Sequence, residues 1–175
     1  MTKKTATLKK VFADDSLMIF GSNGLIEGVR VKKTKVIPDE RGRLGEILRA
    51  DDPWFEKFGQ SYFTTTYPGM VKAWHYHKIQ TDNFYVPKGT IKVALYDDRK
   101  DSKTYRSVNQ IYLSEHCPSL LQIPPSVYHG WMCIGDTEAY VINITTEVYN
   151  YADPDEYRTD PHDNDIPYDW TQKDG

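Results

Sequence analysis

The sequence is poor in cysteine and has no long apolar stretch. Its two cysteines, Cys117 and Cys133, form no CxxC motif, and two thiols cannot build a disulfide framework or a thiolate metal site alone. The purely apolar runs, such as Leu17 to Phe20, are only a few residues long and too short to span a membrane, and no apolar stretch follows the N-terminal lysines as in a signal peptide. We therefore expect reduced structural thiols, no membrane contact and a cytoplasmic location.

The sequence also lacks an excess of positive charge. It has 22 Lys and Arg against 25 Asp and Glu, a net charge of −3, which argues against nucleic acid as a partner. Residues 1–49 hold 11 basic against 6 acidic side chains, whereas residues 150–175 hold 8 acidic against 2 basic ones. These termini are either solvated separately or meet, within one chain or across a dimer.

A length of 175 residues predicts one domain over 1–175, with 1–27 as an N-terminal extension and 150–175 as an acidic C-terminal segment. Short stretches rich in Tyr, Val, Ile and Thr, separated by Gly, Pro and Asp, predict strands. The expected strands are 28–37, 43–49, 60–67, 70–77, 83–86, 90–97, 105–114, 119–123, 127–134 and 138–149. Since no crossover helices separate them, a parallel α/β sheet is excluded and an all-β sandwich or jelly roll is favoured.

One short helix is expected within this pattern. Asp52 would be its N-cap, Pro53 would occupy its first turn and Gly59 would be its C-cap.

Three of the five histidines fall on predicted strands. His75 and His77 are two residues apart, so on a strand their side chains point to the same face. Together with Asp82 and the later His129 they follow the spacing of the two cupin motifs, except that a glutamate is usual at Asp82 and a glycine at Ser126. Three imidazoles and a carboxylate suit Fe, Mn, Ni or Zn, while the alternative is that each histidine is a hydrogen-bonded barrel residue.

A second resemblance runs from about Ile26 to Trp170. Its motifs include Asp39-x-Arg41-Gly42-x-Leu44-x-Glu46, Phe58-Gly59-Gln60, Gly69-Met70-Val71-Lys72-Ala73-Trp74-His75-Tyr76, Ile123-Pro124-x3-Tyr128-His129-Gly130, Tyr149 and Asp160-Pro161. In this order they resemble the dTDP-4-dehydrorhamnose 3,5-epimerase family of nucleotide-sugar enzymes. The resemblance implies a cupin-like jelly roll (double-stranded β-helix) with a few short helices, a homodimer, and inversion of C3, C5 or both in a nucleotide-diphospho-4-keto-6-deoxy sugar, without a metal or cofactor.

The resemblance also implies roles for single residues. A 4-keto group acidifies the neighbouring C–H bonds, so inversion needs one group to remove a proton and another to return one on the opposite face. By resemblance His75 is the base, Asp160 orients it, and Tyr149 is the acid. Substrate-binding positions of the family are matched by Arg41 and Lys72 for the diphosphate, Glu46 and Gln60 for the nucleobase or sugar, and His129 in the active site.

Two departures from the family keep other functions open. Asp82 stands where a lysine is common and would oppose the negative charge of an enolate, and His77 replaces a residue that is often glutamine. The chain is then a divergent epimerase, or a metal-dependent cupin enzyme that uses His75, His77, Asp82 and His129, or a non-catalytic sugar-binding jelly roll.

Overall fold

The fold is a two-sheet antiparallel jelly roll. The structure, a computed structural model, describes residues 5–11 and 17–172. Its strands are β1 (Lys9–Lys10), β2 (Ile19–Gly21), β3 (Arg30–Lys33), β4 (Val36–Asp39), β5 (Gly42–Gly45), β6 (Gln60–Thr66), β7 (Val71–Tyr76), β8 (Asp82–Lys88), β9 (Thr90–Asp97), β10 (Val108–Ser114), β11 (Ser119–Ile123), β12 (Val127–Cys133), β13 (Ala139–Thr145) and β14 (Tyr157–Arg158). The predicted all-β jelly roll is confirmed.

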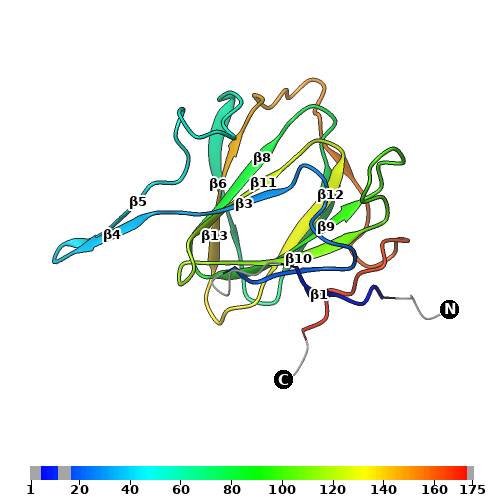
Figure 1. The fold of residues 1–175 in the computed structure, drawn as a ribbon, viewed down its shortest axis with the longest axis horizontal. Helices are drawn as coiled ribbons and strands as arrows, with labels where there is room; N and C mark the ends of the chain where they lie inside the picture. The colour runs from blue at the N-terminus through cyan, green and yellow to red at the C-terminus, as the bar shows by residue number, and fades with distance from the viewer. Residues whose placement is uncertain (1–4, 12–16, 173–175) are drawn as a thin grey trace.

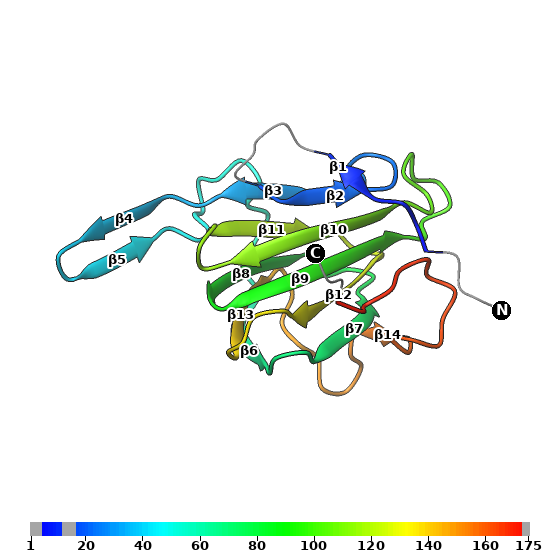
Figure 2. The same cartoon turned by 90° about the horizontal axis from the view of Figure 1, so that it is seen from below.

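The strands form two facing layers and a separate hairpin (Figure 1). One sheet has the order β1-β2-β10-β9-β12-β7-β14 and the other the order β3-β11-β8-β13-β6. Side chains from both sheets, such as Val93 on β9 and Leu121 on β11, share one buried apolar core between the layers. The hairpin β4–β5 projects away from the two layers (Figure 2).

Every predicted strand range overlaps an observed strand, although several bounds differ. The range 43–49 holds only β5, because the chain leaves the hairpin after Gly45. Three short strands, β1, β2 and β14, were not predicted from the sequence, since two or three residues are too few to show a period-two pattern.

The predicted helix starting at Asp52 is wrong, and the described residues contain no helix at all. The Asp52 carboxylate accepts a hydrogen bond from the preceding Arg49 N–H (2.9 Å) and pairs with Lys32, so it does not cap the residues that follow. The Trp54 carbonyl accepts a hydrogen bond from Gln122 (3.0 Å), and the Gly59 N–H donates to the Thr145 carbonyl (2.8 Å). Tertiary partners therefore take the backbone groups that a helix needs.

The two ends of the described chain meet on the outer face of the larger sheet. A second apolar cluster there joins Trp74 to Tyr168 and Trp170, with Ala6 and Leu8 packed against it. The Ala6 N–H donates to the Pro167 carbonyl (2.8 Å). The ends thus meet within one chain, through apolar contacts and a backbone hydrogen bond. Among the described residues, no helix is long and apolar enough to cross a membrane.

The interior of the jelly roll changes from apolar to polar along its strands. On β13 the buried inward side chains run from Val141 to Asn143 and Thr145, and on β8 Phe84 follows Asp82 at the same face. Buried polar side chains are rare in protein interiors unless they have partners or a function. This polar end is therefore where a functional site should be sought.

Candidate functional site

Three histidines and one aspartate converge at the polar end of the interior. His75 lies on β7 directly opposite His129 on β12, His77 follows β7, and Asp82 begins β8. One ligand atom from each of the four lies within 4.8 Å of the others. We call these four residues the His–Asp cluster. His77, Asp82 and His129 are only 8%, 1% and 1% exposed, whereas His75 is half-buried.

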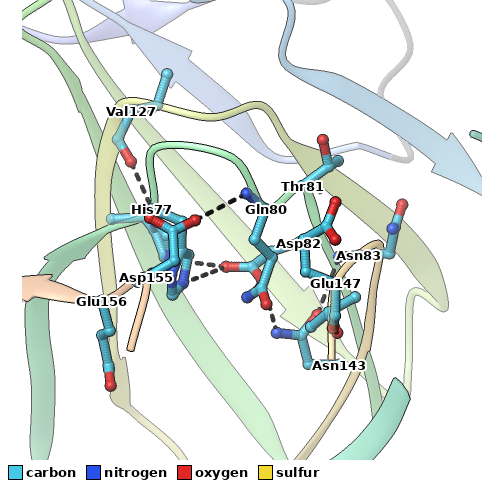
Figure 3. A network of polar contacts seen from close by, with 12 residues as sticks. His77, Gln80, Thr81, Asp82, Asn83, Val127, Asn143, Glu147, Asp155 and Glu156 are labelled. Carbon is cyan, nitrogen blue, oxygen red and sulfur yellow. Dashed lines mark hydrogen bonds and ion pairs between the residues drawn. The ribbon is translucent and has the colours of Figure 1, made fainter. Parts of the chain in front are cut away.

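The Asp82 carboxylate is the centre of the cluster, and its two oxygens differ (Figure 3). Oδ1 accepts hydrogen bonds from the side-chain amides of Gln80 (2.7 Å) and Asn143 (2.9 Å). Oδ2 lies 3.3 Å from Nε2 of His77 and 2.9 Å from Nε2 of His129. One oxygen is therefore held by neutral amides while the other faces two ring nitrogens.

The outer ring nitrogens of His77 and His129 both face backbone carbonyls. Nδ1 of His77 contacts the Asp155 carbonyl, and Nδ1 of His129 lies 2.9 Å from the Val127 carbonyl. The Asp155 carboxylate in turn accepts hydrogen bonds from the backbone N–H groups of residues 78–80, at 2.8 to 3.1 Å. Asp155 thus fixes both the turn after β7 and the orientation of the His77 ring.

The charges of the cluster depend on one another. Burial disfavours the charged form of Asp82, but the imidazoles of His129 and His77 outweigh this and hold its pKa well below the usual range. Burial also works against charge on His77, yet the Asp82 carboxylate raises the pKa of His77. For His75, burial and the neighbouring His129 hold the pKa well below its ordinary value. His75 is therefore favoured as a neutral imidazole.

A tyrosine not selected from the sequence reaches the cluster. Tyr62 on β6 lies opposite Asn143 on β13, and its hydroxyl accepts a hydrogen bond from the Asn143 amide (2.9 Å). The same amide donates to Asp82, so Tyr62 is linked to the cluster through one side chain. Burial raises the pKa of Tyr62 to about 12, which keeps its proton in place at neutral pH. Its period-two relation to Gln60 is the sequence signal that could have identified it.

The structure brings together some of the predicted site residues. His75 and His129 are in ring contact, with centroids 4.1 Å apart. Gln60 accepts a hydrogen bond from the Tyr149 N–H (3.2 Å), while the Tyr149 ring is 39% exposed and packs against Tyr151. Within the described ranges, no hydrogen bond links the Tyr149 ring to the cluster. Its role as acid stays a prediction.

The remaining predicted residues lie apart from these. Lys72 is on β7, three residues before His75, and donates to the Thr64 hydroxyl (2.7 Å). Arg41 is at the tip of the β4–β5 hairpin, paired with Asp39. Glu46 lies at the base of that hairpin, 3.0 Å from Arg49.

Asp160 does not meet His75. Its carboxylate accepts hydrogen bonds from the backbone N–H groups of His162 and Asp163 (2.8 Å each), as in a turn-capping residue. In the described part of the chain no contact joins it to His75. The predicted role of Asp160 in orienting the base is not supported by this arrangement. Within the acidic C-terminal segment, it is Asp155 that orients an imidazole, because its backbone carbonyl contacts His77. The sequence gave no signal for this contact.

Comparison with known proteins identifies the family of the chain. The family model for dTDP-4-dehydrorhamnose 3,5-epimerase matches residues 24–175. The spore coat polysaccharide biosynthesis protein SpsL of Bacillus subtilis (strain 168) is 42% identical over 146 residues, which cover 83% of this chain and 97% of that protein. The probable low-salt glycan biosynthesis epimerase Agl13 of Haloferax volcanii is 43% identical over 146 residues, covering 82% of this chain and 89% of the relative.

A solved structure is similar to this chain in its three-dimensional fold as well. The dTDP sugar isomerase from Desulfovibrio desulfuricans G20 superposes with a TM-score of 0.80 at 37% sequence identity. The match covers 85% of this chain and 94% of that structure.

Proposed function

The chain belongs to the dTDP-4-dehydrorhamnose 3,5-epimerase family, and from this premise we propose that it inverts C3, C5 or both in a nucleotide-diphospho-4-keto-6-deoxy sugar. The enzyme is thus a sugar-nucleotide epimerase, and polysaccharide or glycan biosynthesis, named for two relatives, is its proposed setting. The observation that carries the proposal is the family match over residues 24–175, within which the His–Asp cluster lies.

His75 is proposed as the base that removes the proton beside the keto group. It is the half-buried member of the cluster, while the other three are buried. No hydrogen bond occupies its ring among the described residues, so its nitrogen is free to accept a proton from carbon. Removal of that proton leaves an enolate, and return of a proton to the opposite face inverts the centre.

Tyr62 is the phenol that the geometry favours as the opposite-face acid. Its hydroxyl is joined to the cluster through Asn143, and as a donor it still has its own proton to give to the enolate carbon. Tyr149 remains the position that the family resemblance indicates. Both rings are partly exposed, at 43% and 39%, and both belong to the end of the interior where Gln60 lies.

Lys72 and Gln60 are proposed to contact the substrate near the cluster, with Lys72 as a single positive charge toward the diphosphate. Arg41 and Glu46 lie on the projecting hairpin and at its base, so we propose that they serve the site of a second copy in a homodimer. The apolar Ile37 and Leu44 on the same hairpin are exposed and support an interface there. Sedimentation velocity at micromolar concentration is expected to give the mass of two chains.

The cytoplasm is the proposed compartment. The sequence has only two cysteines, Cys117 and Cys133, which cannot build the disulfide framework typical of small secreted domains.

The decisive experiment follows substrate protons in D2O by NMR, with a panel of nucleotide-4-keto-6-deoxy sugars. Wild-type protein is expected to incorporate deuterium with inversion, and His75→Ala to lose both. If Tyr62 is the acid, Tyr62→Phe retains exchange without inversion, and epimer formation falls on the order of 10² to 10⁴-fold. Tyr149→Phe is measured in parallel, because the family resemblance indicates Tyr149 as the acid.

The outcomes separate the alternatives. Retained exchange without inversion in Tyr149→Phe, but not in Tyr62→Phe, would assign the acid to Tyr149 instead. Absence of exchange with every sugar of the panel in the wild type would favour the non-catalytic sugar-binding alternative. Exchange that persists in His75→Ala would remove His75 from the role of base.

A further inference from the structure

Two imidazoles of the cluster are held in one tautomer by their outer contacts. A backbone carbonyl can only accept a hydrogen bond, so the Nδ1 atoms of His77 and His129 must carry protons to bond to the carbonyls of Asp155 and Val127. In a neutral imidazole the other nitrogen then carries a lone pair. The Nε2 atoms of both rings therefore present lone pairs to Asp82 Oδ2, which is itself an acceptor.

Because acceptor atoms face one another here, some buried atoms have no hydrogen-bond partner. Asp82 Oδ2 and His129 Nε2 make no hydrogen bond of acceptable geometry, although they lie 2.9 Å apart and their residues are 1% exposed. Buried polar atoms without partners are rare, and each needs an explanation. Either protons enter the cluster, or a cation lies between the lone pairs.

We propose that His77, Asp82 and His129 bind one divalent transition-metal ion, and that His75 lies beside this ion at the half-buried side without ligating it, so that its ring can still act as the base. Nitrogen and oxygen ligands lie about 2.1 Å from such an ion, so neighbouring ligand atoms are roughly 3.0 to 3.4 Å apart. The separations of 2.9 and 3.3 Å around Asp82 Oδ2 match this spacing. Imidazole with carboxylate suits zinc, iron, nickel or manganese, and no thiolate contributes.

The surroundings of the three ligands have the form of a metal site. Histidines that ligate metals usually donate their other ring N–H to a backbone carbonyl or carboxylate, and ligating carboxylates are themselves hydrogen-bonded. Both histidines have such carbonyls, and Asp82 Oδ1 is held by the Gln80 and Asn143 amides, which leaves Oδ2 for the metal.

The proposal goes beyond the epimerase function and differs from the metal-free reaction that the family resemblance implies. It also explains why a carboxylate, Asp82, lies at this position. A carboxylate alone would oppose the negative charge of an enolate, whereas a carboxylate that holds a divalent cation leaves the cluster with a positive ion at the same place.

The test uses the whole chain, free of any affinity tag, and needs no substrate. Elemental analysis of the purified protein is expected to find about one transition-metal ion per chain. After chelation, titration with Co²⁺ should give a saturable visible spectrum with a one-to-one end point, and Zn²⁺ should displace the cobalt. Circular dichroism and thermal unfolding establish that each variant is folded.

Matched variants locate the ion. His129→Gln and Asp82→Asn are expected to weaken Co²⁺ binding by two orders of magnitude or more. Gln80→Ala, which removes one donor to Asp82, should weaken it by about 10 to 100-fold. His116→Gln, an exposed histidine outside the cluster, should bind as the wild type does.

Clear outcomes would overturn the proposal. It fails if the protein holds no metal and the chelated form gives no Co²⁺ spectrum at millimolar metal, which would assign protons to the cluster instead. It also fails if His116→Gln loses binding as much as His129→Gln. Because binding is measured without sugar, failure of the epimerase assay leaves this result standing, and the reverse also holds.

Discussion

The two buried carboxylates of the described chain, Asp82 and Asp97, are equally hidden from solvent but are bound in opposite ways. Asp97 is held by donors on both oxygens: the Arg99 guanidinium (2.8 and 3.0 Å), the Ser102 hydroxyl (2.6 Å) and the Thr104 hydroxyl (2.7 Å). Asp82 has amide donors on one oxygen only, and the other faces the imidazoles.

The difference separates structure from chemistry. The partners of Asp97 all come from the loop that follows it. The Asp97 carboxylate therefore stabilises the loop of residues 97–104, and both of its oxygens are already occupied by hydrogen bonds. The partners of Asp82 come from separate strands and turns, and one of its oxygens lacks a hydrogen bond. A buried carboxylate with hydrogen-bond donors on both oxygens has a structural role. A buried carboxylate with one oxygen that lacks a donor and faces other ligand atoms indicates a functional role.

The largest effect should come from exchanging each carboxylate for its amide. Asp82→Asn removes the charge at the centre of the cluster, so epimerisation is expected to fall on the order of 10²-fold or more. Asp97→Asn should keep its activity while losing stability, because Asp97 contacts no residue of the cluster in the described structure. Parallel measurements of kcat/KM and urea unfolding check this contrast. Equal losses of activity in the two variants would contradict it.

The sequence predicted the fold well because the core strands are long and their apolar and polar side chains alternate. Period two placed His75 and His77 on one face, and the core strands β9 and β12 were found nearly at their bounds. The predicted helix at Asp52 failed because propensity is a local quantity. In the structure, backbone groups of this predicted helix form hydrogen bonds with Gln122 and Thr145, which are distant in the sequence.

The candidate site was predicted less completely. The resemblance selected His75 and His129, which the fold does bring together. It could not reveal Asn143 or Tyr62, because their meeting depends on the register between β13 and β6. It also assigned Asp160 to His75, whereas local N–H groups bind that carboxylate. Side-chain direction in an acidic loop depends on turn geometry, and composition does not encode it.

The stabilising role of Asp97 should depend on pH. Burial works against its charge, but the hydrogen bonds from Arg99, Ser102 and Thr104 outweigh it and lower the pKa of Asp97 to about 2, from 3.8 in an unfolded chain. A lowered folded-state pKa stabilises the protein above the unfolded pKa and loses that contribution as the pH falls through the folded pKa. The shift corresponds to about 2 kcal/mol.

Urea unfolding of wild type and Asp97→Asn at pH 7, 5 and 3 measures this contribution. The wild type should be more stable by about 2 kcal/mol at pH 7 and 5. The difference should shrink between about pH 4 and pH 2, where the folded carboxylate takes up its proton. A difference that stays constant down to pH 2 would assign the effect of the substitution to packing and not to charge.

The smallest effect should come from one donor of the Asp97 loop. Ser102→Ala removes the 2.6 Å hydrogen bond to Asp97 and should lower the free energy of unfolding by about 1 kcal/mol, since the Arg99 and Thr104 donors remain. Ser61→Ala, at an exposed position on β6, is the matched control and should change stability by less than about 0.5 kcal/mol. Epimerisation should be unchanged in both variants. If Ser102→Ala instead lowers kcat/KM, the Asp97 loop is coupled to the cluster, and the separation between a structural and a functional carboxylate does not hold.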